Sequence, residues 1–102
     1  MDEKKIKWSP EAVTSFLEIL EYFFERNKSR IYSEKLKDNI VQSVKYLSTH
    51  PYLGRETEIK GVRELNYEVY QIYYEIIQNE IRILLIWDGR RNPENLNIFL
   101  KK

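Results

Sequence analysis

The sequence predicts an α+β fold in which a two-helix hairpin packs on one face of a meandering antiparallel sheet. Apolar residues recur every three or four positions between residues 10 and 48, which is typical of amphipathic helices. After residue 58 the apolar period shortens to two, the period of strands. Only three Gly and three Pro interrupt the 102 residues, so we expect long elements and short connections. The expected order is β-α-α-β-β-β, as one domain over residues 1–102.

The first expected element is an edge strand over residues 4–8, where apolar side chains alternate with lysines. Ser9, Pro10 and Glu11 then favour a helix start. Ser9 can accept a backbone N–H bond, Pro10 has the required φ, and Glu11 suits the positive end of the helix dipole. The helix continues to about residue 26 along one apolar stripe, formed by Val13, Phe16, Leu17, Leu20, Phe23 and Phe24.

A second amphipathic helix is expected from residue 30 to residue 48, after the break at residues 27–29. Pro51 follows His50 and stops this helix, because a proline disfavours helical backbone in the residue before it. We interpret His50 as a cation that caps the last helical carbonyls. The buried stripe of this helix consists of Tyr32, Leu36, Ile40, Val44 and Leu47.

Three strands with tight turns follow the helices. Residues 58–65 form a plausible strand, residues 69–76 a clearer one, and residues 80–87 one apolar enough to be buried on both faces. The residue types at 66–68 and 78–79 favour the turns between them. Such short connections predict antiparallel neighbours in the order of the chain.

The composition excludes several kinds of site and partner. With 17 Lys+Arg and 16 Asp+Glu the net charge is +1, which argues against coating nucleic acid by bulk charge. The absence of Cys excludes disulfides and thiolate sites, and a single His excludes a multi-histidine metal site. We therefore expect neither a metal nor another cofactor. The first residues lack a signal-peptide core and no apolar run reaches about 18 residues, so we expect a cytoplasmic protein without a membrane partner.

Five short motifs follow one another along the chain. They are Trp8-Ser9-Pro10-x-Ala12, Leu47-x-x-x-Pro51-x-x-Gly54-Arg55, Gly61-Val62-Arg63-Glu64-Leu65, Tyr70-x-Ile72-x-Tyr74 and Ile83-Leu84-x-Ile86-x-Asp88-x-Arg90-Arg91-Asn92-Pro93. In this order and spacing the chain resembles the RelE/ParE superfamily of toxins from type II toxin–antitoxin modules, from Ile6 to about Leu96. The resemblance implies a small toxin held inactive by a cognate antitoxin. It also implies one of two activities, since some members cleave mRNA on the ribosome and others poison DNA gyrase without hydrolysis.

The positions that carry the nuclease chemistry in that superfamily are mostly occupied by other residue types here. The resemblance places Gln71 where an arginine is expected, and Val62 and Glu64 near the expected lysines, although Lys60 and Arg63 lie close by. No Tyr or His occurs at the terminal position. A carboxylate would repel the scissile phosphate instead of stabilising its developing charge. These differences favour a non-hydrolytic protein, and whether the chain is an enzyme stays open.

Five residues are candidates for contacting the target or the antitoxin: Arg63, Tyr73, Arg82, Arg90 and Arg91. If the chain is instead a metal-independent nuclease, its catalytic set would be Arg63, Arg82, Arg90 and Tyr73. Structural roles compete with these functions. Arg82 can pair across strands with Glu75 or Glu64, Arg63 can form a structural ion pair, and the two arginines after the last strand can be solvated.

Alternation of side chains predicts which of these residues share a face of the sheet. Along residues 69–76 it places Tyr70 and Tyr74 in the core and Tyr73 on the opposite face. Along the last strand it places Arg82 on one face together with Leu84 and Ile86.

The favoured function is a ParE-like toxin that inhibits growth by binding DNA gyrase and is neutralised by an antitoxin. The alternative is a RelE-like, ribosome-dependent mRNA endonuclease that inhibits translation. A third interpretation is an antitoxin-binding remnant without toxicity. The balance of charge after residue 51 favours the first, because an enzyme that enters the ribosome is expected to be markedly basic.

Overall fold

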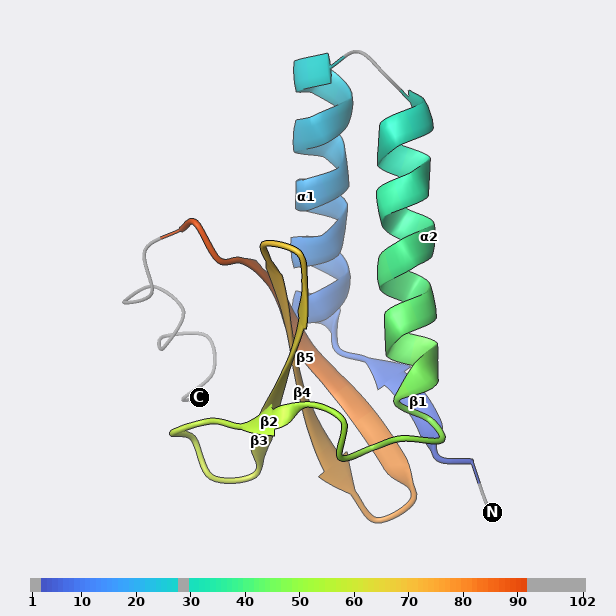
Figure 1. The fold of residues 1–102 in the computed structure, drawn as a ribbon, viewed down its shortest axis with the longest axis vertical. Coiled ribbons are helices and arrows are strands. Elements are labelled where there is room, and N and C mark those ends of the chain that lie inside the picture. Colours follow the sequence, from blue (N-terminus) through green and yellow to red (C-terminus); the bar gives the residue numbers. More distant parts are fainter. Residues whose placement is uncertain (1–2, 28–29, 92–102) are drawn as a thin grey trace.

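A computed structural model of the chain describes residues 3–27 and 30–91, and it has the α+β architecture that the sequence predicts (Figure 1). The elements are β1 (Lys5–Trp8), α1 (Pro10–Asn27), α2 (Arg30–Tyr46), β2 (Arg55–Glu56), β3 (Val62–Tyr67), β4 (Tyr70–Ile77) and β5 (Glu80–Asp88). The five strands form one sheet in the order β1-β5-β4-β3-β2. The two helices lie side by side, and both extend beyond the turn between β3 and β4 (Figure 1).

The junction between β1 and α1 forms as its residue types predict. The backbone N–H of Ala12 donates to Ser9 Oγ at 2.9 Å, which satisfies one of the free donors at the start of the helix. β1 is an edge strand, as expected, and it runs parallel to β5, with Ile6 opposite Ile81. A parallel pair needs a long crossover connection, and here the helical hairpin and the other strands provide it.

The bounds of β3 differ from the prediction, because residues with positive φ form turns on either side of it. β3 begins at Val62, not at residue 58, since residues 58–61 form a turn in which Gly61 has a φ of 85°. The next turn lies at residues 68–69, where Glu68 has a φ of 53°, so β3 extends to Tyr67. The two-residue strand β2 was not predicted, because two residues carry no periodicity.

The end of the second helix also differs from the prediction. α2 stops at Tyr46, two residues before the expected end. The ring of His50 therefore does not cap the helix: it stacks on Tyr46 with ring centroids 4.1 Å apart, and its Nδ1 lies 2.9 Å from Thr49 Oγ1.

A β-bulge in β5 breaks the alternation on which one prediction depended. Tyr73 lies opposite Leu85, but Tyr74 lies opposite Ile83, so Leu84 is an extra residue without a partner across the ladder. Ile86 consequently belongs to the helix-side core, and Leu85 to the other face. The prediction that Arg82 and Ile86 share a face was wrong for this reason.

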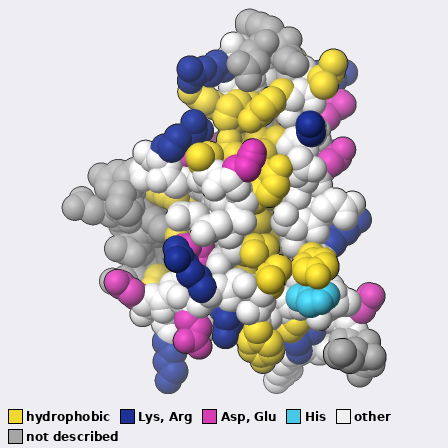
Figure 2. Space-filling view, in the orientation of Figure 1, with side chains coloured by type: hydrophobic (Ala, Val, Ile, Leu, Met, Phe, Trp, Pro, Cys, Tyr) yellow, Lys and Arg dark blue, Asp and Glu magenta, His cyan; other side chains and the backbone are white. Residues whose placement is uncertain are grey.

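Each face of the sheet has its own apolar cluster. The helix-side cluster is the larger and includes fully buried residues of α2, β4 and β5, among them Ile40, Ile72 and Ile83. The cluster on the opposite face, called the far face below, consists of Val62, Tyr73, Leu85 and Trp87. Within residues 3–27 and 30–91, no helix is long and apolar enough to cross a membrane. In Figure 2, positively and negatively charged side chains are interspersed over the visible face, which agrees with the net charge of +1.

Candidate functional site

The predicted site residues lie in three separate places. Arg63 and Tyr73 belong to β3 and β4, Arg82 lies near the start of β5, and Arg90 and Arg91 follow its end. Six residues of strand separate Arg82 from the end of β5, a distance of about 20 Å at the usual rise per residue. The arginines therefore do not converge around one phosphate-sized position.

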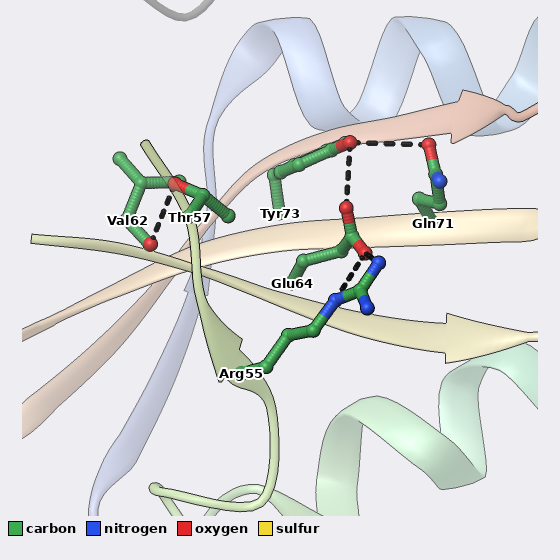
Figure 3. Close-up of polar contacts among 6 residues, drawn as sticks. All are labelled: Arg55, Thr57, Val62, Glu64, Gln71 and Tyr73. Carbon is green, nitrogen blue, oxygen red and sulfur yellow. Dashed lines mark hydrogen bonds and ion pairs between the residues drawn. The ribbon is translucent and has the colours of Figure 1, made fainter. Parts of the chain in front are cut away.

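The far face of the sheet holds a polar network centred on Glu64 (Figure 3). Nε and Nη2 of Arg55 donate to Glu64 Oε1 at 3.0 and 2.7 Å, and the hydroxyl of Tyr73 lies 3.0 Å from Glu64 Oε2. Gln71 Oε1 lies 3.1 Å from the same hydroxyl. Glu64 is 8% exposed, so its charge is buried and compensated by Arg55 and Tyr73.

Tyr73 is a proton donor in this network and not a base. Burial raises the pKa of its hydroxyl well above the usual value, and the hydrogen bond to Glu64 raises that pKa further. A phenol carries one proton, and the carboxylate of Glu64 is its strongest acceptor here. With 4% of its surface exposed, Tyr73 also offers little area to a partner.

Arg63 contacts three residues of the segment that precedes β3, one of them in β2. Its Nη1 donates to the carbonyl of Gly54, its Nη2 lies 3.7 Å from Glu56 Oε1, and its guanidinium lies 5.0 Å from the ring centroid of Tyr52. Tyr52 is 68% exposed, so this cation–π contact occurs at the surface.

Arg82 forms the cross-strand ion pair that the sequence allowed. Its guanidinium lies 3.7 Å from Glu75, the residue opposite it in β4, and 3.6 Å from Glu80. A hydrogen bond from Lys7, together with the charge of Arg82, lowers the pKa of Glu80. Arg82 thus belongs to an exposed charge network at the β1 end of the sheet.

Arg90 and Arg91 are adjacent in sequence and differ in their surroundings. The guanidinium of Arg90 bonds both oxygens of Asp88, at 2.9 and 2.7 Å, and these bonds lower the pKa of Asp88. The guanidinium of Arg91 lies 4.8 Å from the ring centroid of Trp87. Within the described part of the chain, no carboxylate lies within ion-pair distance of Arg91.

A groove runs between α1 and the end of β5 and has Arg91 on its wall. Two adjoining hollows form it, of about 310 and 570 Å³, and both are lined by Ser15, Glu18 and Arg91. Leu85 and Trp87 line the first hollow, and Ile86 with residues of α1 lines the second. Both hollows fall in the size range of ligand pockets, and their lining is partly apolar.

Two important residues were not identified as site residues from the sequence. The sequence indicates Glu64 only as a source of repulsion and gives Arg55 no role, whereas the two form one ion pair through the register of β2 and β3. The sequence signal for this pair is the opposite charge of two residues on neighbouring strands. It can be recognised only when β2 is known to pair with β3. In residues 3–27 and 30–91, no group of three acidic, His or Cys side chains could hold a metal ion.

Comparison with known families decides what kind of protein this is. The model of a family described as the ParE toxin of the type II toxin–antitoxin system parDE matches residues 6–93. The chain belongs to the ParE toxin family. The resemblance to RelE/ParE toxins inferred from the five motifs is thereby confirmed. A search of curated proteins found no match.

Two solved structures have the fold of this ParE family member. One is the chromosomal ParDE toxin–antitoxin system from P. aeruginosa, with 26% identity and a TM-score of 0.73 over 82% of this chain and 94% of the other. The second is the RelBE2 toxin–antitoxin complex from Mycobacterium tuberculosis, with a TM-score of 0.61 over 82% and 95% of the two chains. At 14% identity, the second similarity shows the fold alone.

Proposed function

We propose that this ParE family toxin inhibits growth by binding a protein, DNA gyrase, without hydrolysing a substrate, and that a cognate antitoxin neutralises it. Membership of a type II toxin family carries the first part of this statement. The similar structures come from toxin–antitoxin systems, which supports an antitoxin as the regulatory partner of this chain as well.

The buried, compensated carboxylate of Glu64 is the observation that carries the non-hydrolytic proposal. A metal-independent nuclease needs cations around the scissile phosphate and a group that accepts a proton near neutral pH. On the far face, the cation beside this position, Arg55, is bound to Glu64. The phenol of Tyr73 has a raised pKa and donates a hydrogen bond to the same carboxylate.

The spread of the arginines supports the same proposal. A phosphate in transition-state geometry needs its donors within about 3 Å of its oxygens. Arg82 and Arg90 lie toward opposite ends of β5, and each is bonded to carboxylates of its own neighbourhood. Binding to a protein requires no such convergence.

The test is to express the chain alone in bacteria and follow growth, ribosome-bound mRNA and plasmid topology. We expect growth arrest with intact transcripts and linearised plasmid, and inhibition of supercoiling by purified gyrase when the purified chain is added. mRNA cleavage without DNA damage would contradict the proposal and support the endonuclease. Absence of any arrest would support a remnant without toxicity.

A Tyr73→Phe variant makes this test sharper. If the hydroxyl served in catalysis, its loss would reduce mRNA cleavage about 100-fold or more. Under the proposal growth arrest is retained, since Tyr73 is buried and only its structural hydrogen bond is lost. A thermal melt of the variant separates loss of fold from loss of activity.

A further inference from the structure

We propose that the loop between α2 and β2 is the surface through which this toxin binds its target protein, and that the matching surface of the target is apolar with carboxylates at its rim. The inference rests on the proposed function in taking DNA gyrase as the target. It goes beyond that function in assigning the surface and the chemistry that the surface selects. The contacting side chains are those of Tyr46, His50, Tyr52 and Leu53, called the loop patch below.

Hydrogen bonds to the sheet hold the backbone of this loop in place. The buried hydroxyl of Tyr74 accepts from the N–H of Gly54 at 2.9 Å and donates to the carbonyl of Pro51 at 2.8 Å. Nη1 of Arg63 donates to the carbonyl of Gly54. The packing is close enough to require glycine, because a Cβ at position 54 would lie 2.7 Å from a ring carbon of Tyr74 and 2.9 Å from the carbonyl oxygen of Glu64. The loop is therefore ordered before any partner binds.

The side chains of the loop patch lie outside the core and in water. Tyr46, Tyr52 and Leu53 are each more than half exposed, and neither apolar cluster of the described residues includes any member of the patch. The N–H of Leu53 donates to the carbonyl of His50 at 3.1 Å, and this turn keeps the patch compact. Figure 2 shows His50 in cyan with hydrophobic side chains beside it. Exposed apolar groups gathered in this way are typical of sites where another protein binds.

Both tyrosine rings of the loop patch are oriented by contacts within the chain. The guanidinium of Arg63 lies 5.0 Å from the ring centroid of Tyr52. The ring of Tyr46 stacks on that of His50 with centroids 4.1 Å apart. A ring that is already oriented loses less side-chain entropy when a partner covers it, and tyrosine is among the residue types that contribute most of the binding energy at protein interfaces. The two rings are therefore the expected anchors.

The charges around the loop patch favour an acidic partner. A hollow of about 470 Å³ adjoins Tyr46, and another of about 350 Å³ adjoins Tyr52. The charged residues that line the two hollows are three basic and two acidic ones, Lys45, Lys60, Arg63, Glu3 and Glu56. Helix α1, by contrast, carries four glutamates and one arginine. Carboxylates on the target are attracted to the loop and repelled by α1, which sets the orientation of binding.

A nucleic acid fits this surface less well than a protein does. Nucleic acids are bound chiefly through cations on their phosphates. The two arginines beside the loop are engaged by carboxylates instead, since Arg55 lies 2.7 Å from Glu64 and Arg63 lies 3.7 Å from Glu56. The tyrosine rings that would stack on bases each have a face against a side chain of the chain itself.

The loop patch lies apart from the groove between α1 and the end of β5. In Figure 1 the loop follows the lower end of α2, on the right, whereas β5 ends on the left. The two surfaces can therefore be altered and tested separately.

The experiment measures inhibition of supercoiling by purified gyrase, and binding of the full-length toxin to gyrase by titration calorimetry. The loop variant, Tyr52→Ala with Leu53→Ala, removes the exposed apolar side chains of the loop. Its matched control, Ile31→Ala with Val69→Ala, removes two exposed apolar side chains at the start of α2 and in the turn between β3 and β4. We expect the loop variant to bind and inhibit gyrase about 30-fold more weakly, the control to act as the wild type does, and both to keep the melting temperature of the wild type.

A charge reversal tests the acidic rim and does not depend on the fold of the loop. Lys45→Glu changes an exposed residue in the last turn of α2. It should weaken binding to gyrase about tenfold at low salt and by less at high salt. Unchanged or tighter binding would overturn the acidic character of the target surface.

The outcomes separate this inference from the proposed function. If the wild type inhibits gyrase and the folded loop variant inhibits it equally, the loop patch is overturned as the target surface while the proposed function stands. If the loop variant still inhibits gyrase but no longer binds the protein encoded by the adjacent open reading frame, the patch belongs to the antitoxin, against the inference. Loss of binding to a DNA duplex without loss of binding to gyrase would assign the patch to nucleic acid, also against it. A wild type that neither binds nor inhibits gyrase would count against the proposed function itself, and with it against the inference.

Discussion

The two faces of the sheet bury different kinds of side chain. The helix-side face buries aliphatic and aromatic side chains against α1 and α2, and Ile72, Ile81 and Ile83 have no exposed surface there. The far face buries only a small apolar cluster and, beside it, the charged side chain of Glu64. The first arrangement gains free energy from removing apolar area from water, whereas the second must satisfy each polar atom that it buries.

Strand β4 carries tyrosines on both faces of the sheet, so the two faces can be compared within one strand. On the helix side, Tyr74 is fully buried, and its hydroxyl accepts from the N–H of Gly54 and donates to the carbonyl of Pro51. On the far face, the hydroxyl of Tyr73 is bonded to Glu64. Tyr70 is buried on the helix side, and among the described residues its hydroxyl has no hydrogen-bond partner. Burial raises the pKa of Tyr70 to about 12.

The largest expected effect tests whether the helix side carries most of the stability. Ile83→Ala removes a fully buried side chain from the large cluster and should lower the free energy of unfolding by about 4 kcal/mol. Leu85→Ala, in the small cluster of the far face, should lower it by about 2 kcal/mol, because fewer neighbours lose contacts. Urea unfolding of both variants measures the difference. Equal losses would mean that the two faces contribute alike.

A second prediction compares three tyrosine-to-phenylalanine variants. Tyr74→Phe should cost about 2 kcal/mol, because it leaves the buried N–H of Gly54 and the half-buried carbonyl of Pro51 without this partner. Tyr73→Phe should cost about 1 kcal/mol, since Arg55 still compensates Glu64. Tyr70→Phe should be neutral or stabilise by up to about 1 kcal/mol, because the lost hydroxyl makes no bond. Denaturant unfolding gives the three values, and a clear destabilisation by Tyr70→Phe would show that its hydroxyl is satisfied.

The smallest expected effect concerns the ion pair at the end of β5. The pKa of Asp88 is lowered in the folded chain, first by its hydrogen bonds to Arg90, so the folded state binds fewer protons than the unfolded state. The stabilisation is present above the ordinary pKa of an aspartate, about 3.9, and is lost as the pH falls below it. For a partly exposed pair it amounts to less than about 1 kcal/mol. Melting temperatures measured from pH 6 to pH 2.5 should fall less steeply for Asp88→Asn, and identical slopes would contradict this.

Local sequence signals were sufficient for every element except β2, and for the family. The apolar period of α1 and α2, the Ser9 cap and the alternation of β4 depend on residues within a few positions of one another. The burial of Tyr70 and Tyr74 followed from that alternation and is confirmed. The five motifs sufficed to predict the superfamily.

The details of the site depend on residues far apart in the chain. The bulge at Leu84 arises from the register between β4 and β5, and it moved Ile86 to the helix side. Glu64 acquires its partner Arg55 only when β2 pairs with β3.

Periodicity and capping thus determined the two helices and four of the five strands, and the motifs the superfamily, because each depends on near neighbours in sequence. Which arginine pairs with Asp88 and which lies on Trp87 did not follow from the sequence, since Arg90 and Arg91 differ only in what surrounds them. Asp88 turns back to Arg90, and the ring of Trp87 supports Arg91. Such contacts follow from strand register and side-chain direction, which the packing of the whole chain sets.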